Sequence, residues 1–170
     1  MKIASVIVLA LALAASVTDL RNGRIPNVLT FGGALAAIIF HGFRGGGAGL
    51  LMASGGWIAG AAVFFPAFAL GGMGAGDVKL LAALGAWLGP ADAMWLAIYS
   101  GIAGGVLALS VALASGYLRQ AMANIRLLLT HWCVSGVGPL DQVSLAGSNG
   151  PRLAYAVPIF VGTLATIWLH

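Results

Sequence analysis

The feature of this 170-residue sequence that most limits its fold is a series of long apolar runs. A membrane-spanning helix needs about 20 mostly apolar residues. Hydrophobic residues make up 61% of the chain and charged residues 7%, a composition that excludes an ordinary soluble domain. We therefore predict an all-α membrane protein, a polytopic bundle of six transmembrane helices. The apolar runs cover 3–18, 27–43, 48–70, 78–88, 91–116 and 153–169.

The basic residues predict the orientation of these spans, because loops rich in Lys and Arg generally face the cytoplasm. The first, third and fifth loops hold six basic residues, and the opposite side holds two. We therefore expect those three loops to be cytoplasmic and both termini to lie on the non-cytoplasmic side. The six are Arg21, Arg24, Lys79, Arg119, Arg126 and Arg152, and the two are Lys2 and Arg44.

Two parts of this topology have alternatives. The fourth run, 78–88, is short for a span and contains Lys79. We expect a short crossing in a locally thinned bilayer, with Lys79 reaching the interface. A re-entrant segment is the alternative, and it would reverse the charge asymmetry. The first run, which ends in "ALAAS", also resembles a secretory signal peptide. An intact amino terminus on the membrane protein would exclude that second alternative.

Several kinds of site are not predicted. The basic residues are scattered singly, which disfavours nucleic-acid binding. The single Cys133 excludes an internal disulfide and a cysteine-based zinc cluster. The three histidines lie far apart in the sequence, so neither a metal nor another cofactor is expected.

Two segments outside the spans have recognisable patterns. The long segment 117–152 begins with "YLRQAMANIRLLLTHW", which is typical of a helix at the membrane surface. Its later part, "SLAGSNGP", is typical of a flexible connector. The segment is interpreted as an inert linker, with docking of a partner or substrate as the alternative. Within the spans, the pairs Gly56–Gly60 and Gly101–Gly105 have the spacing that lets helices pack closely in lipid.

The four acidic residues are all aspartates, and two of them are predicted to lie together. Asp19 ends the first run and Asp77 precedes the fourth. Two complete crossings separate them, so both are expected on the same face, whether or not the fourth run crosses. Asp92 lies in a turn on the opposite face, and Asp141 lies within the long loop.

A pair of close aspartates points to a specific chemistry. Two such carboxyl groups cannot both ionise readily, so they share a proton. One can then activate a water molecule while the other donates to the carbonyl oxygen of a substrate, which is the chemistry of aspartyl peptide hydrolysis. The base cannot be assigned, because such a pair titrates as a unit. Taken singly, Asp19 could be a solvated flank and Asp77 a helix cap.

Three motifs resemble one family. "GMGAGDVKLL" (72–81) is similar to the GxGD signature of intramembrane aspartyl proteases, and its Asp-Val-Lys continuation resembles the type IV prepilin peptidases. "TDLRNGRIPN" (18–27) resembles that family's other catalytic segment. "LAYAVPIFVGTL" (153–164) resembles its last-span Pro-Tyr region, with Ala154 in place of an expected proline.

The resemblance implies a membrane aspartic endopeptidase, a single membrane-embedded domain over 1–170 that removes the short basic leader of prepilins at the cytoplasmic membrane face. It implies that Asp19 and Asp77 are the catalytic pair. The residues that it implies for the active-site loop or for substrate binding are Gly74, Gly76, Lys79, Arg24, Pro26 and Asn27.

The short chain lacks the cysteine-bearing insertion of the larger members, so it resembles the peptidase-only branch of Flp-type tight-adherence pili, without methyltransferase activity. The expected partners are a prepilin, the lipid bilayer and the pilus-assembly machinery, and the expected location is the bacterial cytoplasmic membrane. Two alternatives are a proton- or ion-coupled transporter and a non-catalytic assembly factor. A carboxylate pair near one face argues against the transporter, whose site is expected at the midplane.

Overall fold

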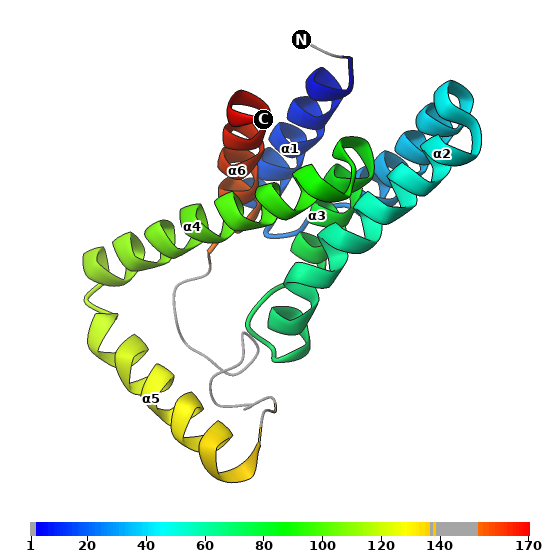
Figure 1. Ribbon diagram of the computed structural model, residues 1–170. Helices are drawn as coiled ribbons and strands as arrows, with labels where there is room; N and C mark the ends of the chain where they lie inside the picture. Colours follow the sequence, from blue (N-terminus) through cyan, green and yellow to red (C-terminus); the bar gives the residue numbers. More distant parts are fainter. Residues whose placement is uncertain (1–2, 137, 139–152) are drawn as a thin grey trace.

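The computed structural model describes residues 3–136, 138 and 153–170, and over these residues the chain is all-α (Figure 1). Three helices, α1, α2 and α4, are long and apolar enough to cross a membrane, whereas α6 is apolar but shorter. The "SLAGSNGP" segment lies outside the described residues. The helices are α1 (Ile3–Asn22), α2 (Asn27–Ala69), α3 (Ala75–Leu88), α4 (Pro90–Ala114), α5 (Leu118–Ser135) and α6 (Ala156–Leu169).

Helix α2 is a hairpin of two helical arms (Figure 1). The chain reverses at Gly46, whose φ of 56° and ψ of −135° are not helical. Glycine adopts a positive φ at little cost, which explains why the "RGGG" stretch bends here. Beyond the bend, the backbone of Gly49 packs directly against the carbonyl group of His41. The two predicted apolar runs 27–43 and 48–70 therefore form the two arms of one element.

Helix α3 forms the core of the bundle. All residues from Leu80 to Trp87 are buried, so this helix is covered on every side. The second arm of α2 packs against one side of α3, because Gly56 and Gly60 let the two backbones touch. The spacing of these glycines predicted such close packing. With 14 residues, α3 is about 21 Å long, well short of a typical hydrocarbon core of about 30 Å. Its surroundings are therefore mainly protein, not lipid.

Helices α1 and α6 lie antiparallel beside each other. Ser16, near the end of α1, donates a hydrogen bond of 2.8 Å to the carbonyl oxygen of Ala156 at the start of α6. Ser5, near the start of α1, lines the same cavity as His170. The start of α1 and the end of α6 therefore lie at one end of the bundle (Figure 1).

Helices α4 and α5 extend from the bundle (Figure 1). Helix α4 packs along α6, then the chain turns at Gly116, which has a φ of 68°, and enters α5. Among the described helices, α5 contacts α4 alone. The helix predicted at the start of the 117–152 segment is therefore present.

Candidate active site

Asp19 and Asp77 lie at the same end of the bundle, opposite the start of α1. Asp19 is in the last turn of α1 and Asp77 in the first turn of α3. The hairpin α2 brings the chain back to this end between them. Ile25, in the turn after α1, packs against Gly76 at the start of α3, so the two segments touch.

Asp19 is held by the first turn of α6. The backbone N–H of Ala156 donates a hydrogen bond of 3.3 Å to Asp19 Oδ2. Backbone N–H groups at the start of a helix have no partner within the helix, and they carry its positive dipole end. The carboxylate of Asp19 therefore satisfies a group that α6 leaves free, and it fixes the start of α6 against α1.

Asp77 is mostly buried and lies outside the three helices of membrane-spanning length. Burial, together with the nearby negative charge of Asp19, raises the pKa of Asp77 to about 7. A hydrogen bond with the Gly74 backbone acts in the opposite direction and lowers this pKa. Asp77 therefore keeps its proton to a much higher pH than an ordinary aspartate does. A neighbouring pair that holds one proton is the arrangement that aspartic hydrolysis requires.

A cavity of about 410 Å³ lies against Asp77. This volume is in the range of ordinary ligand sites. One wall comes from α4, where four small residues at helical spacing leave room for a peptide backbone. The lining residues are Gly72, Met73, Gly74, Asp77, Gly101, Gly104, Gly105, Ala108, Leu153 and Tyr155.

Tyr155 is a site residue that the sequence analysis did not single out. Its ring and hydroxyl lie on the backbone of Gly104, where any larger residue would collide with them. The ring also meets Phe64 edge to face, with the centroids 5.7 Å apart. Burial, followed by the charge of Asp77, raises the pKa of Tyr155. The phenol therefore stays neutral and presents an O–H donor at the cavity wall.

The sequence carried one signal for Tyr155, its place in the "LAYAVP" segment. That segment resembled a family region, but nothing in it indicated which of its residues lies beside Asp77. The place of Tyr155 depends on its packing against Gly104 of α4 and Phe64 of α2, and these residues are far apart from it in the sequence.

The other predicted site residues lie around the cavity in different ways. Gly74 lines it and caps α3. Lys79 Nζ donates to Asn27 Oδ1 over 3.2 Å and lies 5.2 Å from the centroid of the Phe31 ring, which ties α3 to the first turns of α2. Arg24 and Pro26 are exposed in the turn between α1 and α2. Gly76, Lys79, Arg24, Pro26 and Asn27 are not among the residues that line the cavity.

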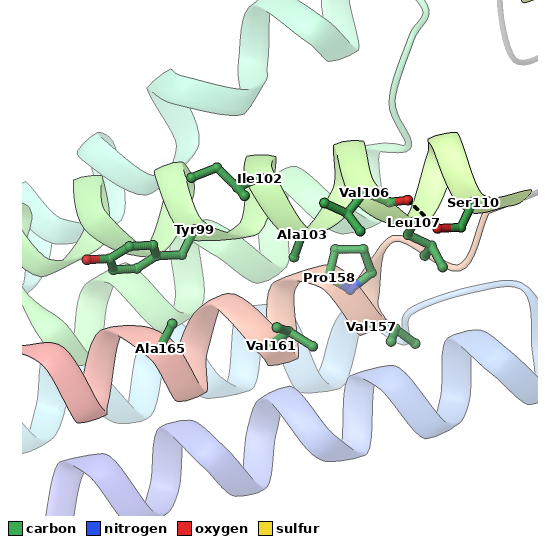
Figure 2. A pocket seen from close by; sticks show the side chains of 10 residues that line it. All are labelled: Tyr99, Ile102, Ala103, Val106, Leu107, Ser110, Val157, Pro158, Val161 and Ala165. Atoms are coloured by element: carbon green, nitrogen blue, oxygen red, sulfur yellow. Dashed lines mark hydrogen bonds between the residues drawn. The ribbon is translucent and has the colours of Figure 1, made fainter. Parts of the chain in front are cut away.

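A second cavity, on the opposite face of α4, is lined by no carboxyl group from the described part of the chain. An apolar groove of about 500 Å³ runs between α4 and α6 (Figure 2). Ile102 and Val106 line one side of it, and Val161 lines the other. The hydroxyl of Ser110 donates to the Val106 carbonyl oxygen of its own helix, over 2.8 Å.

Among the described residues there is no cluster of His, Cys, Asp or Glu that could hold a metal ion.

These features define a class, the membrane-embedded aspartic peptidases, in which carboxyl groups from two separate helices lie at one end of the bundle. Here Asp77 lines the cavity, and Asp19, which does not line it, is near enough to act on the charge of Asp77. The model of the type IV leader peptidase family matches residues 6–109, more than half of the chain and a range that includes both aspartates. The chain belongs to this family of aspartic prepilin peptidases. No curated protein and no solved structure gave a significant match. Family membership implies that the protein processes prepilins and lies in the inner membrane.

Proposed function

We propose that this protein removes the short basic leader from Flp-like type IV prepilins at the cytoplasmic membrane face, with Asp19 and Asp77 as the catalytic pair. The observation that carries the proposal is the setting of Asp77. Its carboxyl group lines a cavity of ligand size, and Asp19 lies near enough to help raise the pKa of Asp77 to about 7.

The pair acts on water in this mechanism. The ionised carboxylate accepts a proton from a water molecule, whose oxygen attacks the scissile carbonyl carbon. The protonated carboxyl group donates to the carbonyl oxygen, which gives a tetrahedral diol. The diol then collapses, the C–N bond breaks, and the departing amine takes up a proton. The small α4 residues Gly101 and Gly105 leave space for the substrate backbone beside Asp77.

The proposed topology has six crossings within one domain, 1–170. Each arm of α2 crosses once, and residues 78–88 of α3 make a short crossing inside the bundle, with Asp77 just before it. Both termini then lie on the non-cytoplasmic side. Two observations support this arrangement, the antiparallel packing of α1 on α6 and the basic residues Arg21, Arg24 and Lys79 near the aspartate end of the bundle.

The test is cleavage of a co-expressed prepilin, followed by the mass of the product. Asp19→Asn and Asp77→Asn are each expected to abolish cleavage, because either change removes half of the pair. Asp92→Asn is the matched control, since Asp92 lies in the first turn of α4 and lines a different cavity, the one shared by Ser5 and His170. Cleavage at the wild-type rate by either of the first two variants would contradict the assignment.

The mass of the same cleavage product also tests whether the protein belongs to the peptidase-only branch of the family. A peptidase-only enzyme leaves the new amino terminus without a methyl group, so its mass equals that of the unmodified mature pilin. A methylated product would contradict the absence of methyltransferase activity. If no prepilin is cleaved and reconstituted protein instead carries protons in an Asp77-dependent way, the protein is a transporter.

A further inference from the structure

Helix α5 carries an exposed apolar surface that the peptidase mechanism does not use. Met122, Ile125, Leu129 and Cys133 follow one another at spacings of three or four residues, so they lie along one side of the helix. We name these four residues the α5 strip. The three larger side chains are 51%, 47% and 54% exposed, and Cys133 is exposed as well.

Two arginines flank the α5 strip on one side. Arg119 and Arg126 are seven residues apart, which places them on the same edge of the helix, and both are exposed. The sequence of α5 contains no acidic residue. This edge is therefore positive, and a partner of complementary charge must be anionic.

The position of α5 places it at the boundary of the membrane. Only three residues separate it from α4, a helix long and apolar enough to span the bilayer. Arg119, Gln120, Asn124 and Arg126 make α5 too polar to follow α4 across. A helix with a polar face, basic edge residues and an apolar side lies in the plane of the interface.

We propose that α5 is a membrane-surface helix that binds anionic lipid. The α5 strip enters the layer of acyl chains, while Arg119 and Arg126 bind phosphate groups of anionic headgroups. Guanidinium groups suit this role because they bind phosphate through paired hydrogen bonds. The prepilin leader is a poorer partner for this edge of the helix, since the resemblance implies that it is basic.

Binding of lipid by α5 also bears on the active site. The same α4 that leads into α5 supplies Gly101, Gly104 and Gly105 to the cavity beside Asp77. Anchoring α5 at the interface fixes the depth of the carboxyl end of α4 in the bilayer. The proposal does not depend on which residues cleave the substrate, and it can be tested without any peptidase assay.

The test uses Cys133, the single cysteine of the chain, as a probe on the α5 strip. The full-length protein is labelled there with a polarity-sensitive fluorophore and reconstituted into vesicles of phosphatidylcholine, with or without phosphatidylglycerol. We expect quenching by lipid-attached nitroxide and protection from aqueous iodide, both stronger with phosphatidylglycerol. Equal exposure to iodide in the two membranes would overturn the proposal. Protection that appears only after prepilin is added would also overturn it, in favour of a peptide-binding helix.

Charge variants test the headgroup contact. Arg119→Gln with Arg126→Gln is expected to reduce the preference for anionic vesicles on the order of fivefold for each arginine. Arg44→Gln, in the bend of α2, is the matched control and is expected to leave the preference unchanged. Ile125→Ser with Leu129→Ser is expected to weaken insertion in both kinds of vesicle. An unchanged preference in the double arginine variant would contradict the headgroup contact.

Discussion

Asp19 accepts a hydrogen bond of 3.3 Å from the backbone N–H of Ala156, a residue 137 positions further along the chain. This contact joins the last turn of α1 to the first turn of α6. Since Tyr155 precedes Ala156 and lines the cavity beside Asp77, the first turn of α6 touches the surroundings of both aspartates.

The hydrogen bond from Ser16 to Ala156 is expected to stabilise the α1–α6 contact. Ser16 is 5% exposed, so Ser16→Ala would leave the Ala156 carbonyl without this buried partner. We expect a loss of about 1 kcal/mol in the free energy of unfolding. Thermal unfolding in detergent measures it. Ser110→Ala, which removes a hydroxyl bonded only to its own helix, is expected to change little. Equal stability of the two variants would contradict the assigned role of Ser16.

The hydroxyl of Tyr155 is expected to act in the peptidase reaction. Tyr155→Phe keeps the ring on Gly104 and removes only the O–H donor at the cavity wall. We expect cleavage to slow by roughly tenfold to a hundredfold, the effect of losing one hydrogen bond to a charged group, with unchanged thermal stability. The measurement is the initial rate of leader removal. Tyr99→Phe is the matched control, because Tyr99 lines the groove on the opposite face of α4. A Tyr155→Phe enzyme with the wild-type rate would remove the hydroxyl from the mechanism.

Stability is expected to depend on pH through Asp77. The folded pKa of about 7 exceeds the ordinary value of 3.8, so between these values the folded protein holds a proton that the unfolded chain has lost. Stability therefore falls as the pH rises from about 4 to about 7. Asp77→Asn is expected to flatten this part of the profile, and Asp92→Asn is expected to keep it. Chemical unfolding at a series of pH values measures the effect, and identical slopes in wild type and Asp77→Asn would contradict it.

The rate of the peptidase reaction is expected to depend on the protonation of Asp77. Hydrolysis needs one proton on the pair, and above a pH of about 7 Asp77 loses it. We expect the rate of leader removal to decline on the alkaline side of neutrality. A rate that stays constant from pH 7 to about 9 would show that the shared proton is not required.

The close approach of Tyr155 to Gly104 is expected to forbid a side chain at that position. A methyl group on Gly104 would overlap the phenol, whereas one on Gly105 meets nothing within 4 Å. Overpacking typically costs about 1–3 kcal/mol, so Gly104→Ala is expected to lower the unfolding temperature and Gly105→Ala is not. A Gly104→Ala protein as stable as the wild type would show that the ring can move aside.

The sequence predicted the elements better than their assembly. Apolar runs located the helices, because burial in lipid and burial in protein both require apolar residues, and the gap between the runs 27–43 and 48–70 located the bend at Gly46. The two aspartates could be paired by counting crossings alone. The position of α3 could not be predicted, since a short apolar run has the same pattern whether lipid or protein covers it. Tyr155 was missed because its contacts with Gly104 and Phe64 join segments far apart in the chain.

The burial of α3 has a consequence for how the enzyme tolerates different membranes. In the proposed topology lipid acyl chains meet the outer helices, whereas the residues from Leu80 to Trp87 are buried against other parts of the protein. A thicker or thinner bilayer therefore acts on the tilt of α1, α2 and α4 before it acts on the helix that carries Asp77. The carboxyl group of Asp77 therefore keeps its position within the bundle while the outer helices tilt to match the thickness of the membrane.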